Sequence, residues 1–420
     1  MCFRNKIWIF ILPALLIPAA AIHAQEDVRM TVRSDGFRRI NLEIHTFSSE
    51  RRSAIPSRVR SMLIDDLRLS GFFDIILPDT PADGGWRFVP ASSVAVQGHV
   101  SVDGGGLELE IRIVEKPSDQ LIITKPYDAT LQDLRELAHR CADDIVLFLT
   151  GYRGISTTKI VFVSERPDSK ELSVIDFDGS SREQLTYNRS LNISPCWSPD
   201  GNRLAFTSFF SGNPDLVILD IGRRRYTNIS RINELHSAPS WSPDGGRIAL
   251  ALTKEGNADI YSMRDDGSGL RRLTHSPAIE SAPSWSPDGR QIVFTSGRSG
   301  SPQLYVMDAD GGNVRRLTYE GRYNDSADWS PQGSTIAFVT RERGGFQICT
   351  IDVTGENLLR LTDSRGSNEN PSWSPNGMWL TFASSRSGQW DIYVIARDGT
   401  GLRRLTESGG NISPAWSPIL

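Results

Sequence analysis

The sequence predicts a small α+β N-terminal domain followed by an all-β six-bladed β-propeller that its C-terminal strand closes. Two observations predict this two-domain fold. From Trp197 onward a Trp-Ser-Pro motif recurs every 43 or 44 residues, which is the period of a four-stranded propeller blade. Residues 26–150 lack that repeat and instead mix helical and alternating apolar patterns. The motif begins at Trp197, Trp241, Trp285, Trp329, Trp373 and Trp416.

Composition excludes several broad classes. The chain has 420 residues, with 46 basic against 50 acidic side chains and 39% hydrophobic residues. The near balance of charge argues against a nucleic-acid-binding protein, which needs a basic surface. The apolar content is too high for a disordered chain, and the length suits two or three folded domains.

The first residues predict a cleaved secretory signal peptide over residues 1–24. Arg4 and Lys6 precede a short apolar run, and small residues follow, so cleavage after Ala21 or Ala24 fits the pattern. The run is too short to span a membrane, and an uncleaved anchor is the alternative. Removing Arg4 and Lys6 from the 46 basic residues leaves 44 against 50 acidic residues, so the exported form carries a net charge of −6.

Residues 25–150 predict the α+β domain. An apolar residue every fourth position from Ile55 to Leu67 indicates an amphipathic helix. Alternating apolar residues in 94–102 and 107–113 predict two strands of a hairpin, and 121–124 predicts a third strand. Residues 26–33, before the helix, alternate only weakly and could form either an edge strand or a mobile terminus.

A second helix is expected to close this domain. Thr130 and Asp133 resemble a capping box, and Gly151 is expected to end the helix. Gly151 to Gly154 form a short linker to the propeller, which is assigned to residues 155–420. The side chains expected to be buried are Leu131, Leu134, Ala138, Cys141, Ile145 and Phe148.

Each blade follows one pattern. After Trp285-Ser-Pro-Asp-Gly come three short β-prone runs, 291–295, 303–307 and 315–318, bounded by turn residues. Pro287 and Gly289 suit a type I turn, and Asp310-Gly311 predicts a tight hairpin with positive φ. The tryptophans are best explained as wedges that pack blade against blade.

Two incomplete units predict how the ring closes. The first unit, 159–186, lacks a preceding Trp-Ser-Pro, whereas the last segment, 411–416, has the motif and no strands after it. The two fragments are complementary. We therefore expect 411–416 to supply the innermost strand of the first unit, which gives six blades and leaves no open edge.

No motif for catalysis, a metal or a cofactor is found. The chain has no Gly-x-Ser-x-Gly, His-Glu-x-x-His or phosphate-binding loop. Cys141, Cys196 and Cys349 lie in apolar patterns and are expected to be buried free thiols, although export permits a disulfide. The chain therefore predicts a binding protein, with a secreted propeller hydrolase or lyase of non-standard site, using Glu280 or Asp325, as the alternative.

The loops that lead into the innermost strands should converge at one mouth of the central pore. Loops on a rigid scaffold commonly carry function. These loops are polar with few charges, which suits a protein partner. The candidate binding residues at this pore rim are His236, Ser237, Ala238, Glu280, Ser281, Tyr323, Asn324, Asp325, Asn368, Glu369 and Asn411.

Together these features resemble the TolB family of the Tol-Pal system. The resemblance rests on the Leu149-Thr-Gly-Tyr-Arg-Gly154 junction, the Trp-Ser-Pro-Asp-Gly blades and the ending Pro414-Ala-Trp-Ser-Pro418-Ile-Leu, and it covers the mature chain. One departure is Arg223-Arg224-Arg225, which replaces the hairpin turn of one blade.

The resemblance implies a monomeric, non-enzymatic periplasmic adaptor that supports outer-membrane invagination at division and outer-membrane integrity. It implies two partners: Pal, the peptidoglycan-associated lipoprotein, at the pore rim, and TolA at the N-terminal segment. Pal would hold the protein peripherally at the outer membrane. The residues that match the TolA-binding segment are Glu26, Asp27, Val28, Arg29, Met30, Thr31 and Val32.

Overall fold

The structure is a computed structural model that describes residues 39–50, 53–78, 93–229, 235–254, 256–342, 344–363 and 366–420. The predicted signal peptide and the segment Glu26–Val32 lie outside the described residues, as do the side chains of Leu235 and His236. Among the described helices, none combines the length and the apolar character that crossing a membrane requires.

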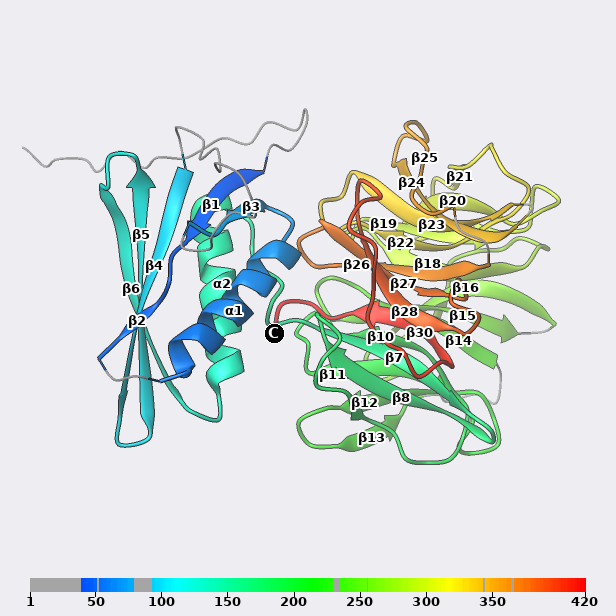
Figure 1. Ribbon diagram of the computed structural model, residues 1–420. Coiled ribbons are helices and arrows are strands. Elements are labelled where there is room, and N and C mark those ends of the chain that lie inside the picture. Colours follow the sequence, from blue (N-terminus) through cyan, green and yellow to red (C-terminus); the bar gives the residue numbers. More distant parts are fainter. Residues whose placement is uncertain are drawn as a thin grey trace, which may run out of the picture. The chain divides into compact units, whose positions relative to one another are not determined.

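The N-terminal part consists of a mixed sheet and two helices (Figure 1). The sheet has the order β3-β1-β4-β5-β6, with β2 paired to β4, and β1 runs parallel to both β3 and β4. In chain order the elements are β1 (Ile40–Ile44), β2 (Ser48–Ser49), α1 (Ile55–Leu69), β3 (Phe73–Ile76), β4 (Ser93–Asp103), β5 (Gly106–Lys116), β6 (Leu121–Thr130) and α2 (Leu134–Thr150).

The predicted α1 and the β4–β5 hairpin are confirmed. In β5, the apolar side chains at 107, 109, 111 and 113 are buried while the charged residues between them are exposed, as a strand with one covered face requires. Val59, Leu63 and Leu67 of α1 are fully buried. The core of this part therefore lies between the two helices and one face of the sheet.

The predictions for the second helix need correction. Helix α2 begins at Leu134 and Asp133 is its N-cap, without a side-chain capping bond, while Thr130 is still the last residue of β6. Consequently Leu131, at 45% exposure, lies in the turn before the helix. Phe148 is also 45% exposed, because the buried face of the last turns runs through Ala142, Ile145 and Val146 instead. Gly151 ends the helix in the left-handed conformation, as expected.

Strands β1 and β3 were not predicted from the sequence. Each is only four or five residues long and pairs in parallel with a strand distant in the chain. Such short runs lack the alternation and the adjoining turn that reveal a hairpin. Strand β6 is also longer than the predicted 121–124, because its pairing with β5 continues to Thr130.

The rest of the chain forms six four-stranded antiparallel sheets around a central channel, so the predicted six-bladed propeller is confirmed. We number the blades 1 to 6 from the first complete unit. Each blade is given from its innermost to its outermost strand: blade 1 has β10 (Asn192–Trp197), β11 (Arg203–Ser208), β12 (Asp215–Asp220) and β13 (Arg225–Asn228), and blade 2 has β14 (Leu235–Trp241), β15 (Arg247–Lys254), β16 (Asn257–Arg264) and β17 (Arg271–Arg272). Blade 3 has β18 (Glu280–Trp285), β19 (Gln291–Ser296), β20 (Gln303–Asp308) and β21 (Arg315–Arg316), and blade 4 has β22 (Asn324–Trp329), β23 (Thr335–Glu342), β24 (Gly345–Asp352) and β25 (Leu359–Arg360). Blade 5 has β26 (Asn368–Trp373), β27 (Trp379–Ser384), β28 (Asp391–Ala396) and β29 (Arg403–Arg404), and blade 6 has β30 (Asn411–Trp416), β7 (Lys159–Arg166), β8 (Ser169–Asp176) and β9 (Glu183–Gln184).

The ring is closed by the two ends of the propeller chain. Strand β30 pairs antiparallel with β7, with Asn411 opposite Ser164 and Trp416 opposite Ile160. The hydroxyl of Ser417 accepts a hydrogen bond from the backbone N–H of Lys159 at 2.9 Å. The predicted closure by the C-terminal strand is therefore confirmed, and no blade is left with an unpaired inner edge among the described strands.

Candidate functional site

The innermost strand of every blade carries a bulge that faces the channel. Its register against the second strand shifts at the same place in all six blades. At each bulge one residue other than glycine has φ between 47° and 53°, a conformation that costs on the order of 1–3 kcal/mol. The six residues are Ser194, Ala238, Ala282, Ser326, Asn370 and Ser413. The ring geometry therefore imposes one strained backbone position per blade around the channel.

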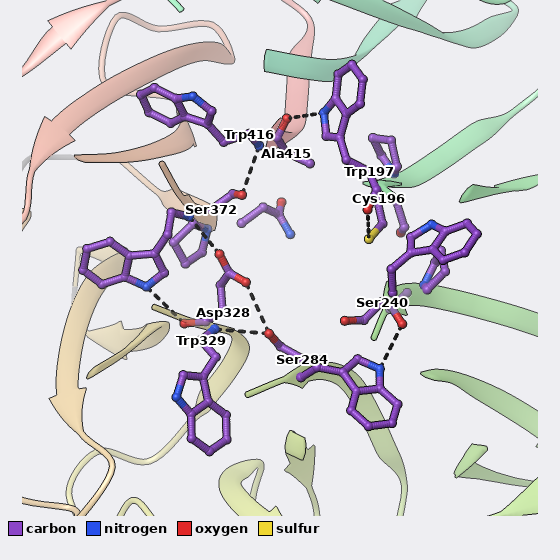
Figure 2. A pocket seen from close by; sticks show the side chains of 18 of the residues that line it. Cys196, Trp197, Ser240, Ser284, Asp328, Trp329, Ser372, Ala415 and Trp416 are labelled. Atoms are coloured by element: carbon purple, nitrogen blue, oxygen red, sulfur yellow. Dashed lines mark hydrogen bonds between the residues drawn. The ribbon is translucent and has the colours of Figure 1, made fainter. Parts of the chain in front are cut away.

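These bulges and the Trp-Ser-Pro segments that follow them line a channel of about 520 Å³ (Figure 2). All six blades contribute to its wall. The wall consists mostly of serine, proline and tryptophan atoms, so it is neither strongly apolar nor strongly charged. Such a wall suits structural hydrogen bonds between the blades.

The tryptophans join neighbouring blades. Their side chains are only 6–8% exposed, and Trp241 packs among apolar residues of both blade 1 and blade 2. Three indole N–H groups each donate to a backbone carbonyl of the preceding blade: Trp197 to Ala415 at 3.1 Å, Trp285 to Ser240 at 3.2 Å and Trp373 to Asp328 at 3.2 Å. The interpretation of these residues as wedges between blades is confirmed.

Asp328 is the only charged side chain among the described residues of the channel wall. It occupies the position before the blade tryptophan, where blades 2, 3 and 5 carry serine. One carboxylate oxygen accepts the backbone N–H of Trp373 at 2.8 Å, and the other accepts the hydroxyl of Ser284 at 3.3 Å (Figure 2). Burial in the narrow channel raises the pKa of Asp328 to about 6, although these hydrogen bonds act to lower it.

Four of the predicted rim residues are buried inside the blades rather than presented at the rim. They are at most 1% exposed, and each is the first residue of an innermost strand. Glu280, for example, accepts hydrogen bonds from Ser296 at 2.9 Å and from Arg298 at 2.8 Å. The four are Glu280, Asn324, Asn368 and Asn411. They anchor the start of the innermost strands, so they position the rim loops and do not offer their own side chains to a partner.

Other predicted rim residues are partly exposed. The hydroxyl of Tyr323 donates to Asp325 at 3.0 Å, and its ring lies 5.5 Å from that of Phe346. Burial raises the pKa of Glu369, and the negative charge of Asp325 adds to that rise. The structure thus brings Tyr323, Asp325 and Glu369 together where blades 4 and 5 meet. Ser237 and Ser281 are partly exposed on blades 2 and 3.

Two further predictions have a different outcome. Ala238 is at the bulge of blade 2 and lines the channel, with a φ of 48°. His236 lies in β14, but its side chain is outside the described residues.

Sequence reasoning missed Asp328 and the ring of strained bulges. The signal for Asp328 was present, because the residue before the tryptophan is Cys196, Ser240, Ser284, Ser372 or Ala415 in the other blades. A carboxylate among these small residues stands out once the six repeats are aligned. The bulges had no such signal, since five of the six positions are serine or alanine, which do not by themselves indicate positive φ.

The alternative, a secreted propeller hydrolase or lyase, would depend on Glu280 or Asp325. Glu280 is fully enclosed and ion-paired with Arg298, which is the environment of a structural carboxylate. The three cysteines are free, with Cys141 and Cys349 buried and Cys196 partly accessible. Across the described ranges, no group of three or more His, Cys, Asp or Glu side chains is arranged to hold a metal ion.

Comparison with known proteins gives a consistent result. The family model described as the TolB beta propeller domain matches residues 147–420. Among curated relatives, a TolB homolog of Chlorobium luteolum is 36% identical over 215 residues, covering 48% of this chain and 49% of the relative. The Tol-Pal system protein TolB of Geobacter metallireducens is 40% identical over 216 residues, again covering 48% and 49%. The matched segments therefore span about half the length of these curated relatives.

The solved structures extend the similarity to most of the chain. TolB from Acinetobacter baumannii superposes with a TM-score of 0.78 at 26% identity, covering 91% of this chain and 97% of that one. A TolB from Agrobacterium tumefaciens has a TM-score of 0.51 at 25% identity, covering 61% and 91%. Because the family model accounts for well over half of the sequence, this chain belongs to the TolB β-propeller family.

Proposed function

We propose that this protein is a periplasmic adaptor of the Tol-Pal system that carries out no catalysis. It links the peptidoglycan-associated lipoprotein Pal to TolA, and thereby supports invagination of the outer membrane at cell division and the integrity of that membrane. The observation that carries the proposal is the likeness to A. baumannii TolB over 91% of the chain. Relatives named as Tol-Pal system proteins support the same assignment.

The proposed domain organisation follows from this role. Residues 1–24 direct export and are removed, residues 25–150 form the N-terminal domain with the TolA-binding segment Glu26–Val32, and residues 155–420 form the propeller. The protein acts as a monomer, peripheral to the outer membrane through Pal. The apolar run at residues 7–17 supports export.

Pal is proposed to dock at the pore rim where blades 4 and 5 meet. The partly exposed Tyr323, Asp325 and Glu369 offer an aromatic ring, a hydroxyl and two carboxylates within one small area. Aromatic residues framed by hydrogen-bonding groups are typical centres of protein interfaces. The buried Asn324 and Asn368 support this patch by fixing the backbone on which it stands.

A binding assay with the purified soluble parts of Pal and TolA tests the proposal. Replacing Tyr323 with Ala and Glu369 with Gln together should weaken Pal binding by at least about tenfold, because truncation of an interface centre commonly costs 2 kcal/mol or more. The matched control is Asp310→Asn, an exposed carboxylate in the β20–β21 turn at the opposite end of blade 3.

The same assay examines the N-terminal segment. Deletion of residues 25–33 should abolish TolA binding and leave Pal binding equal or tighter. Loss of both partners on this deletion would contradict the separation of the two sites, and unchanged Pal binding by the rim variant would contradict docking at blades 4 and 5. A protein that binds neither partner in its unmodified form is not the proposed adaptor.

A further inference from the structure

Blade 1 differs from blades 3 and 5 in a way that opens a second pocket. A cavity of about 930 Å³ lies between β9 of blade 6, with the loop that follows it, and β12 and β13 of blade 1. Its lining is more apolar than polar in character and includes Leu185 and Val217. Tyr187 and Phe210, both 70% exposed, and Tyr226, at 45%, stand around it. The described part of the channel wall has no residue in common with this pocket.

The corresponding space in blades 3 and 5 is filled by an arginine of the chain itself. Arg298 lies over the rings of Phe294 and Tyr305, at 5.6 and 4.9 Å from their centroids. In blade 5, Arg386 lies 5.0 Å from the Tyr393 ring in the same arrangement. Each arginine is thus held on an aromatic surface by a cation–π contact.

Blade 1 lacks both members of this pair. The backbone N–H of Phe210 donates to Ser208 in the way that the N–H of Arg298 donates to Ser296, so Phe210 takes the place of the arginine. Strand pairing sets Val217 opposite Phe206, where blade 3 has Tyr305 opposite Phe294. The guanidinium and the tyrosine ring are therefore both missing from blade 1, and the pocket occupies their place.

A second arginine is also missing. In blades 2 and 5 an aspartate at or near the start of the third strand is ion-paired with an outer-strand arginine, Asp259 with Arg272 at 2.5 Å and Asp391 with Arg404 at 2.6 Å. In blade 1 the equivalent aspartate is Asp215, and the outer-strand position is Asn228, which pairs with Val217 as Arg404 pairs with Tyr393.

Among the described residues, Asp215 consequently lacks the cation that Asp259 and Asp391 have. It is 9% exposed, lines the pocket, and forms no ion pair with any described residue. The Ser211 hydroxyl at 2.5 Å and the Asn228 side-chain amide at 2.7 Å both donate to its Oδ2 atom. A largely buried carboxylate is stabilised by a charged donor on its other oxygen.

We infer that this pocket binds an arginine side chain of a partner protein. The guanidinium would donate to Oδ1 of Asp215 and stack on Phe210, Tyr187 or Tyr226, which reproduces between two proteins what Arg404 and Arg386 do within blade 5. Arginine fits better than lysine because its planar group can stack and donate two parallel hydrogen bonds at once.

The other charged side chains of the pocket indicate which residue of the partner should lie next to that arginine. Arg224 is already ion-paired with Glu183, so it does not oppose a cation. Arg189 is exposed at the pocket and has no described ion pair. A partner segment with a carboxylate next to its arginine would satisfy both Arg189 and Asp215.

The test uses the full-length protein and the peptide acetyl-Leu-Arg-Glu-amide as the probe, with binding followed by NMR. Shifts are expected at residues of β9, β12 and β13. A second peptide carries citrulline, which has the shape of arginine without its charge, and should bind about tenfold more weakly or not at all, because charge-assisted hydrogen bonds are about twice as strong as neutral ones. Equal binding of the two peptides, or shifts confined to other blades, would overturn the proposal.

Two variants make the assignment specific. Asp215→Asn should weaken the arginine peptide by about tenfold, whereas the control Asp220→Asn, at the other end of β12, should leave its affinity unchanged. The double variant Val217→Tyr, Phe210→Arg rebuilds the blade 5 arrangement and should abolish binding while retaining the unfolding temperature. Binding that persists in this filled variant would contradict the pocket as the site.

Other occupants are distinguished by two further measurements. If changing Arg29 and Arg33 to Gln makes the probe bind markedly more tightly, the N-terminal segment of this chain fills the pocket and a separate partner is ruled out. If the probe converts dimers to monomers in sedimentation, a second copy is the occupant, and the inference of a different partner is likewise overturned. Neither result depends on Pal or TolA binding, so the proposed function stands or falls separately.

Discussion

At the scale of single residues, the blades differ by substitutions at equivalent positions of one repeated frame. In blades 3 and 4 the side chain before the blade tryptophan accepts the backbone N–H of the next blade's tryptophan: Ser284 from Trp329 at 3.1 Å and Asp328 from Trp373 at 2.8 Å. A serine hydroxyl performs this task without charge. Asp328 performs it with a carboxylate whose ionised form burial disfavours.

Replacing Asp328 with Ser should therefore change how stability depends on pH. Because the pKa of Asp328 is raised from 3.8 to about 6 in the folded state, the folded chain retains a proton that the unfolded chain loses, and this group lowers the free energy of unfolding as pH rises from about 4 to 7. In Asp328→Ser the urea midpoint at pH 7 should rise relative to that at pH 4.5, by the equivalent of about 1–2 kcal/mol after allowance for screening by channel water.

The control for this prediction is Asp288→Asn. Hydrogen bonds from the Ser286 hydroxyl and the Arg290 N–H lower the pKa of Asp288 in its turn, so this group stabilises the fold at neutral pH and loses that effect as pH falls. Its removal should alter the pH slope in the opposite direction. An Asp328→Ser protein with the unmodified pH profile would show that Asp328 is charged without penalty in the channel.

At the scale of elements, local pattern predicted a strand or helix well where neighbours in sequence are neighbours in space. The β4–β5 hairpin and α1 are of this kind. Strands β1 and β3 depend instead on parallel pairing across the chain, and the sequence offered no local signal for them. Gly98 in β4 shows the same dependence on distant residues. A side chain at this position would collide with the ring of Phe47, whereas the backbone conformation of Gly98 does not itself demand glycine.

Substitution of Gly98 by Ala should destabilise the N-terminal domain. The added methyl group would lie 2.6 Å from the ring of Phe47, which is 5% exposed and has little room to move. We expect a loss of about 1–3 kcal/mol in the free energy of unfolding, the usual cost of overpacking. Denaturant unfolding followed by circular dichroism measures it.

Two companion variants define the cause. Gly106→Ala, where the nearest atom beyond the chain neighbours is a backbone oxygen at 3.4 Å, should be tolerated. Gly98→Ala combined with Phe47→Leu should recover part of the lost stability, as coupled neighbours do. If the double variant loses the sum of the two single effects, the contact with Phe47 is not the reason for the glycine.

At the scale of the whole molecule, the propeller ring is closed within a single blade, blade 6, where β30 pairs with β7. The last strand supplies the Ala415 carbonyl that accepts the Trp197 indole N–H, and its own Trp416 donates to the Thr158 hydroxyl at 2.9 Å. Without it, β7 would present an unpaired inner edge to the channel and both neighbouring blade interfaces would lose contacts.

Removal of residues 411–420 should therefore cost far more than a ten-residue terminal deletion ordinarily does. We expect a fall in the unfolding temperature of at least about 10 °C or outright insolubility, because Trp416 alone is a buried tryptophan whose loss costs roughly 3–5 kcal/mol. Addition of a synthetic 411–420 peptide should restore the transition if the deleted strand acts by closing the ring. A truncated protein that unfolds at the unmodified temperature would contradict closure as the source of stability.

By itself, the sequence determined the number of blades, their closure and the role of the tryptophans. A repeat aligns its own equivalent positions, and a large apolar side chain that recurs once per blade is buried between adjacent blades. Only the tertiary structure decided which polar side chains reach solvent. Glu280, Asn324, Asn368 and Asn411 begin rim strands and yet are buried. Glu280 accepts a hydrogen bond within its own blade, whereas the three asparagines donate to the third strand of the preceding blade, at Gln303, Gln347 and Asp391. The pocket at Asp215 likewise became visible only when the strands of different blades were set in register. The missing arginine is recognised only by comparison with the equivalent position in other blades, and blade 1 alone gives no sequence signal for it.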